Sequence, residues 1–158
     1  MIKNYVFNLT LKFPPVLVTF LFGFLAWLLI LVGPDIELPR VARIILCASI
    51  SALGLILCGM GVHVFSTRGT TVNPVSPDRA SCLITTGIYS VTRNPMYLGF
   101  LCILIAWAIF LGNAFSLFSP AGFIMYLNRY QIIPEESILH QKFGDEFVQY
   151  KLKVKRWL

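Results

Sequence analysis

Long runs of apolar residues without charge dominate this sequence and limit what it can fold into. Three of them, residues 16–33, 44–62 and 95–112, contain no Asp, Glu, Lys or Arg. A helix needs about 20 mostly apolar residues to cross a bilayer, so each run predicts a transmembrane helix. A fourth run, residues 114–133, is interrupted by Pro120 and predicts a fourth span.

Composition agrees with a membrane protein. Apolar residues make up 57% of the chain and charged residues only 13%, whereas soluble domains carry about 25% charged residues. The 158 residues are expected to form one membrane-embedded domain, with N-terminal spans over residues 1–62 and a second part over residues 63–158. The predicted fold class is all-α, a polytopic membrane protein with about four transmembrane helices.

The positions of Lys and Arg predict the orientation. If both termini face the cytoplasm, 11 of the 13 basic residues are cytoplasmic and only Arg40 and Arg43 lie outside, as the positive-inside rule requires. The net charge of +6 then reflects topology and contact with anionic lipid headgroups rather than nucleic acid. Short length and compact loops favour a bacterial inner membrane over the endoplasmic reticulum.

Metal binding and disulfides are not expected, because the four cysteines form no CxxC pair and three of them lie in predicted spans. Gly112-Asn113 is the whole link between the third and fourth runs, which predicts a tight antiparallel hairpin. The longest stretch outside the spans covers residues 63–94. We expect its apolar second half to pack on the helices or on the membrane surface, with Gly87 free to adopt a positive φ.

A further helix is expected after the fourth run. Pro134 followed by two glutamates is typical of a helix start, and the helix is expected to end at Gly144. The amphipathic segment that follows carries Phe147, Tyr150 and Val154 on one face, and we expect this cytoplasmic C-terminal region to lie on the inner leaflet.

Polar and aromatic residues near the ends of the predicted helices gather on the cytoplasmic side. They are Tyr89, Arg93, Asn94, Tyr97, Arg129, Glu135 and Glu136. Together they would form a polar site at the membrane boundary, which suits an amphiphilic substrate. The alternative is that the cations follow the positive-inside rule, the tyrosines form an interfacial belt and the glutamates cap a helix.

Two linked motifs favour the first interpretation. GIYSVTRNPMYLG (residues 87–99) is followed downstream by EESILHQKFGDEFVQYKLKVKRWL (residues 135–158). In this order they resemble the G-x-Y-x-x-x-R-H/N-P-x-Y-x-G and E-E-x-x-L-x-x-x-F-G-x-x-F/Y-x-x-Y motifs of isoprenylcysteine carboxyl methyltransferases and their bacterial relatives, shared in part with phospholipid methyltransferases. The resemblance implies an S-adenosylmethionine-dependent membrane methyltransferase whose cofactor is held by residues 63–158. A lipophilic or lipidated acceptor would enter from the bilayer, and carboxyl O-methylation is the expected reaction.

The resemblance also implies roles for single residues. Carried over by position, the cofactor would be contacted by Ser81, Cys82, Leu83, Ile84, Tyr89, Asn94, Pro95, Met96, Tyr97 and Glu135. Arg93, Arg129 and Glu136 are the candidate catalytic residues. The arginines would attract a negatively charged acceptor, and Glu136 or Tyr97 would take a proton from an amine acceptor.

Two positions depart from the family pattern. Asn94 stands where the eukaryotic carboxyl methyltransferases have His, and Gln131 stands where they have an Arg near the substrate. Two alternatives therefore stay open. Membrane sterol reductases share a similar Tyr, Arg-His-Pro and Tyr pattern and use NADPH, and a non-catalytic membrane protein would need neither cofactor.

Overall fold

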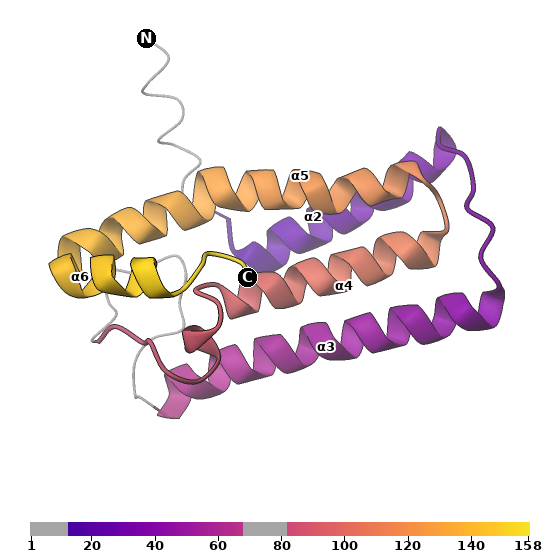
Figure 1. Ribbon diagram of the computed structural model, residues 1–158. Helices are drawn as coiled ribbons and strands as arrows, with labels where there is room; N and C mark the ends of the chain where they lie inside the picture. The colour runs from indigo at the N-terminus through magenta and orange to yellow at the C-terminus, as the bar shows by residue number, and fades with distance from the viewer. Residues whose placement is uncertain (1–12, 68–81) are drawn as a thin grey trace, which may run out of the picture.

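The computed structural model describes residues 13–67 and 82–158, and this part of the chain is all α-helical (Figure 1). Helix α2 (Pro15–Leu28) continues into a 3₁₀ turn (Leu29–Leu31), and α3 (Arg40–Thr67) runs back in the opposite direction. The remaining elements are a 3₁₀ helix (Gly87–Ser90), α4 (Pro95–Leu111), a 3₁₀ turn (Phe115–Leu117), α5 (Phe118–Leu127), a π-helical segment (Asn128–Ile132) and α6 (Ile133–Lys153). The predicted fold class, all-α, is confirmed.

Prolines stand at the starts of three helices. Pro15 and Pro95 are the first residues of α2 and α4, and Pro134 is the second residue of α6. Proline is well suited to these positions because the first N–H groups of a helix have no intrahelical partner. Pro120 lies in the first turn of α5, so it does not interrupt the fourth helix as its place in the apolar run suggested.

Helix α4 lies at the centre of the bundle, in contact with α3 on one side and with α2 and α5 on the other (Figure 1). Its contact with α3 depends on small residues. A Cβ atom added to Gly54 would lie 2.7 Å from the carbonyl oxygen of Gly99, and one added to Gly61 would lie 2.7 Å from Met96 Cγ. Small residues at a helix crossing let the two backbones approach closely, as is common in membrane proteins.

Side-chain hydrogen bonds to backbone carbonyls attach α2 to its neighbours. Ser116 Oγ donates to the carbonyl of Ala26 at 2.7 Å, and Ser119 Oγ donates to that of Phe22 at 2.6 Å. Trp107 Nε1 on α4 donates to the carbonyl of Gly23 at 2.9 Å. The hydrophobic core between these helices includes Leu104, Phe123, Leu127 and Ile132, each at most 1% exposed.

The predicted tight hairpin between α4 and α5 is confirmed. Gly112 ends α4 with a φ of 65°, a conformation that glycine adopts without strain. Its carbonyl accepts the N–H of Ile36 at 2.6 Å, and Asn113 Nδ2 donates to the carbonyl of Gly33 at 2.6 Å. The connection between α2 and α3 is thereby held against this turn.

Two helix boundaries differ from the prediction. Helix α3 covers Arg40–Thr67 and so extends beyond the predicted span 44–62 at both ends. The chain from α5 to α6 is continuous through the π-helical segment rather than starting afresh at Pro134. The expected break at Gly144 is confirmed, with φ 51° and ψ −126°.

The C-terminal region does not present its apolar face to a lipid leaflet, so that expectation was wrong. Phe147, Tyr150 and Val154 are 1%, 7% and 7% exposed, and they pack with Leu83, Leu139 and Phe143. The physical reason is the break at Gly144, which turns the second half of α6 back against the first half and against the segment after residue 82.

Helix length alone establishes one candidate membrane span. Among the described helices, α3 is long and apolar enough to cross a bilayer by itself, whereas the apolar helices Pro15–Leu31 and Pro95–Leu111 are shorter. Large apolar side chains nevertheless cover the outer surface of the bundle, for example Phe20 at 72% and Leu55 at 64% exposure. The four-span topology stays a prediction.

Candidate functional site

A cavity of about 300 Å³ lies at the end of the bundle where α2 begins and α3 ends, within the size range of small-molecule sites. The start of α4, the segment before it and both halves of α6 complete its wall. The lining residues are Pro14, Pro15, Val16, Phe65, Cys82, Leu83, Ile84, Tyr89, Arg93, Asn94, Pro95, Met96, Tyr97, Phe100, Glu135, Glu136, Leu139, Phe147 and Tyr150.

The structure brings most of the predicted site residues to this cavity. The lining includes Cys82, Leu83, Ile84, Tyr89, Asn94, Pro95, Met96, Tyr97 and Glu135 from the predicted cofactor set. Ser81 lies outside the described residues. Of the three candidate catalytic residues, Arg93 and Glu136 line the cavity, whereas Arg129 is exposed on the π-helical segment and does not. The roles of all these residues stay predictions.

Glu135 is the carboxylate at the centre of the wall. The hydroxyl of Tyr97 and Nε2 of Gln131 both donate to its Oε1, the latter at 2.8 Å. Burial raises the pKa of Glu135 from 4.5 to about 7, although the two hydrogen bonds lower it, and neighbouring Glu136 adds to the rise.

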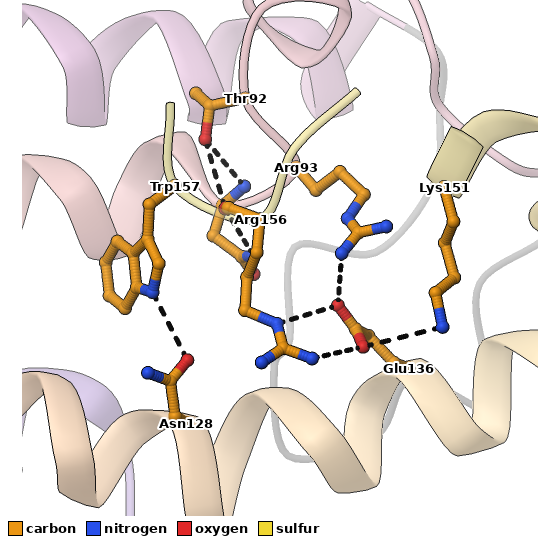
Figure 2. A network of polar contacts seen from close by, with 8 residues as sticks. Thr92, Arg93, Asn128, Glu136, Lys151, Arg156 and Trp157 are labelled. Atoms are coloured by element: carbon orange, nitrogen blue, oxygen red, sulfur yellow. Dashed lines mark hydrogen bonds and ion pairs between the residues drawn. The ribbon is translucent and has the colours of Figure 1, made fainter. Parts of the chain in front are cut away.

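The next residue, Glu136, is held in an ionic network (Figure 2). Arg93 Nη2 binds its Oε1 at 2.8 Å, and Arg156 binds both oxygens, with Nε to Oε1 at 3.1 Å and Nη2 to Oε2 at 2.7 Å. Lys151 Nζ lies 3.9 Å from Oε2. Glu136, whose side chain is 12% exposed, is anchored by two guanidinium groups.

Arg93 has unused hydrogen-bonding capacity beside the cavity. Its side chain is 10% exposed, and its Nε is buried without a partner among the described residues. Buried donors are almost always paired in folded proteins, so this atom is open to an acceptor other than those of the described residues.

The segment before α4 is positioned by aromatic contacts. A positive φ of 63° at Gly87 turns the chain, and Tyr89 then packs edge-on against Phe65 of α3, with ring centroids 5.4 Å apart. Tyr150 of α6 donates its hydroxyl hydrogen to the carbonyl of Tyr89 at 2.7 Å. Helices α3 and α6 therefore hold this wall of the cavity from two sides.

Sequence reasoning missed several lining residues, namely Pro14, Pro15, Val16, Phe65, Phe100, Leu139, Phe147 and Tyr150. Phe147 and Tyr150 belong to the second motif and were assigned to a lipid-facing surface. Their aromatic character in a segment rich in lysine was the available signal. Leu139 is the leucine of the same motif, so the motif was an available signal for it as well. The remaining five are apolar residues in apolar segments, and no sequence pattern separates them from their neighbours.

Comparison with known proteins finds relatives that match part of this chain. An uncharacterised protein of Haemophilus influenzae is 49% identical over 63 residues, which are 40% of this chain and the whole of that protein. The protein-S-isoprenylcysteine O-methyltransferase of Schizosaccharomyces pombe is 39% identical over 74 residues, which are 46% of this chain and 30% of that enzyme.

Residues 42–146 match the sequence profile of the phospholipid methyltransferase family. The matched region is 105 of 158 residues and contains most of α3, all of α4 and α5, and the two glutamates of α6. It therefore includes most of the cavity wall. This chain belongs to the phospholipid methyltransferase family.

Proposed function

We propose that this protein is an integral membrane methyltransferase that takes a methyl group from S-adenosylmethionine and transfers it to a lipophilic acceptor. The observation that carries the proposal is the cavity of a methyltransferase-family chain in which Glu135 places a carboxylate in an otherwise largely apolar wall. The name of the Schizosaccharomyces pombe relative, an O-methyltransferase, supports O-methylation of a carboxylate as the reaction.

The chemistry of the wall fits this cofactor, which combines a cationic sulfonium, an amino-acid group and an adenine ring. Glu135 offers its carboxylate to a cationic group, and Nε of Arg93, which has no partner among the described residues, offers a donor to a carboxylate. Leu83, Ile84 and the ring of Tyr89 offer apolar and aromatic surface to the adenine ring. Asn94 can donate and accept hydrogen bonds, so the replacement of His at this position is compatible with binding.

Bound S-adenosylmethionine supplies an electrophilic methyl group. In this proposal the chain itself aligns the reactants and excludes water, which are the main requirements of an in-line displacement. For a carboxylate acceptor no proton has to be removed, and a poorly hydrated site favours the neutralisation of charge. Arg93 attracts the acceptor's negative charge, and Glu136 holds the guanidinium of Arg93 in place.

An amine acceptor would require a proton acceptor. Both oxygens of Glu136 are already bound by guanidinium groups, and the hydroxyl of Tyr97 donates to Glu135. Glu135, whose pKa is raised to about 7, is then the residue best placed to take a proton. Arg129 lies outside the cavity wall, so in this proposal Arg93 takes over its predicted part in attracting the acceptor.

We also propose that α2, α3, α4 and α5 all cross the membrane, with both termini in the cytoplasm of a bacterium and the cavity at the cytoplasmic face. The exposed apolar surface of the bundle and the distribution of basic residues support this arrangement. The segments Pro15–Leu31 and Pro95–Leu111, at 17 residues each, span about 26 Å at a rise of about 1.5 Å per residue. Helix α5 has 10 residues and is lengthened at its two ends by the 3₁₀ turn and the π-helical segment.

Calorimetric titration of the purified protein with S-adenosylhomocysteine tests the proposal. We expect saturable binding to the wild type and strongly weakened binding to Glu135→Ala. Glu146→Ala, which removes an exposed carboxylate from the same helix, is the matched control and should bind as the wild type does. Binding of NADPH alone in a parallel titration would favour the reductase, and failure to bind either ligand would favour a non-catalytic protein.

A further inference from the structure

The last residues of the chain fold back over the cavity wall. Val154 is buried, and the backbone that follows it contacts the segment 92–94 (Figure 2). Nε1 of Trp157 donates to Oδ1 of Asn128 on the π-helical segment at 3.2 Å. Residues 154–158, which we call the C-terminal strap, therefore connect the end of α6 to two other parts of the structure.

Segment 92–94 obtains hydrogen-bond partners from the strap. The backbone N–H of Arg93 donates to the carbonyl of Lys155 at 3.1 Å. The carbonyl of Arg156 accepts twice, from Asn94 Nδ2 at 2.9 Å and from Thr92 Oγ1 at 3.3 Å. Thr92 is 0% exposed, and a buried donor that loses its partner is unfavourable. The strap thus stabilises the backbone on which Arg93 and Asn94 are presented to the cavity.

The side chain of Arg156 reaches the same wall from the other direction. It binds both oxygens of Glu136, and Glu136 in turn binds Nη2 of Arg93. A two-point contact between guanidinium and carboxylate fixes direction as well as distance. The position of Arg156 therefore determines the position of Glu136 and, through it, the orientation of the Arg93 guanidinium.

These contacts lie apart from the core that holds the bundle together. The core side chains Leu104, Phe123 and Leu127 belong to α4 and α5, and the Arg156 side chain is 31% exposed. Loss of the Arg156 side chain should leave the bundle folded. It should loosen the cavity wall, and small displacements of groups that orient a ligand lower binding and reaction rate strongly.

We infer that the C-terminal strap positions the cavity wall and that Arg156 is a positioning residue acting on Arg93 through Glu136. Arg156 does not itself line the cavity. The inference rests on the proposed function, because it takes Arg93 and Asn94 as contacts of the bound cofactor.

The test uses the full-length protein with Arg156→Gln and the adjacent Lys155→Gln, which removes the same charge from an exposed side chain. Arg156→Gln is expected to weaken S-adenosylhomocysteine binding by at least about tenfold, whereas Lys155→Gln should bind as the wild type does. Arg156→Lys, which keeps the charge but loses the two-point geometry, should fall between them. Hydrogen exchange should rise in residues 88–97 of Arg156→Gln and stay unchanged in α2 and α5.

A cycle with Glu136→Gln separates positioning from general destabilisation. If Arg156 acts through Glu136, the double variant binds S-adenosylhomocysteine no more weakly than the single variant with the lower affinity. If the two residues act independently, their losses of binding free energy add in the double variant. Equal ligand affinity of Arg156→Gln and Lys155→Gln overturns the inference and leaves the proposed function standing. If the wild type itself does not bind the ligand, the proposed function fails. The exchange data then decide alone, and equal exchange of residues 88–97 in the two variants overturns the inference.

Discussion

Replacing Glu135 by Gln is expected to stabilise the ligand-free protein at pH 8 and to have little effect on its stability at pH 4. Burial raises the pKa of this carboxyl from 4.5 to about 7, a difference equivalent to about 3 kcal/mol. The neutral amide keeps an oxygen that accepts hydrogen bonds from Tyr97 and Gln131, although more weakly than a carboxylate does. We therefore expect a gain of about 1–3 kcal/mol at pH 8.

The sign follows from the two protonation equilibria. Below pH 4.5 the carboxyl is protonated in the folded and the unfolded protein. Between pH 4.5 and about 7 the unfolded chain releases the proton while the folded protein keeps it, so the contribution of Glu135 to stability falls as the pH rises. Above about pH 7 the loss is complete, and the difference between Glu135→Gln and the wild type is then largest.

Thermal unfolding in mild detergent, followed by far-UV circular dichroism, measures the effect. For a chain of this size the expected gain corresponds to a rise in Tm of about 2–10 °C at pH 8. Glu146→Gln changes an exposed carboxyl on the same helix and should show no pH-dependent difference. If Glu135→Gln lowers Tm at pH 8, the ionised carboxylate is stabilised rather than strained, and the reasoning is refuted. The same variant should bind S-adenosylhomocysteine more weakly at pH 8, because its amide cannot pair with a cation.

Three further substitutions test the packing by the same unfolding assay, with Gly59→Ala as the neutral control because an added Cβ there meets nothing within 4 Å. Gly99→Ala should lower the free energy of unfolding by about 1–3 kcal/mol, because its Cβ would lie 2.6 Å from the carbonyl oxygen of Gly54. An unchanged Tm would show that α3 and α4 can move apart freely. Ser116→Ala should cost about 1 kcal/mol through the lost hydrogen bond to α2, and a neutral result would mean that water replaces it. Gly144→Ala should cost about 1–2 kcal/mol through backbone strain at φ 51° alone, so stabilisation would contradict the break in α6.

The cavity wall shows how far local sequence can lead. Single residues between Ser81 and Tyr97 and the two glutamates of α6 were predicted for the site from two motifs, and those that the structure describes line one cavity. The partners of the two glutamates were not predictable. Gln131 is four residues before Glu135 across a π-helical segment, and the pairing of Glu136 with Arg93 and Arg156 joins residues 43 and 20 positions apart.

The C-terminal region shows where a correct pattern led to a wrong partner. Phe147, Tyr150 and Val154 do form one apolar face, as their spacing predicts. The spacing of apolar residues predicts that one face of a helix is buried. It does not predict whether lipid or protein covers that face. The break at Gly144 decides the matter by returning this face to Leu139 and Phe143 of the same helix.

The sequence by itself determined the helical architecture, the tight turn at Gly112 and the break at Gly144. Each of these follows from interactions within a few neighbouring residues, such as uninterrupted apolar runs, proline at a helix start and the positive φ of glycine. Only the tertiary structure decided which groups donate to Glu135, which groups hold Glu136 and where the last five residues lie. Those depend on contacts between distant segments, whose distances and directions are set by the packing of the whole bundle.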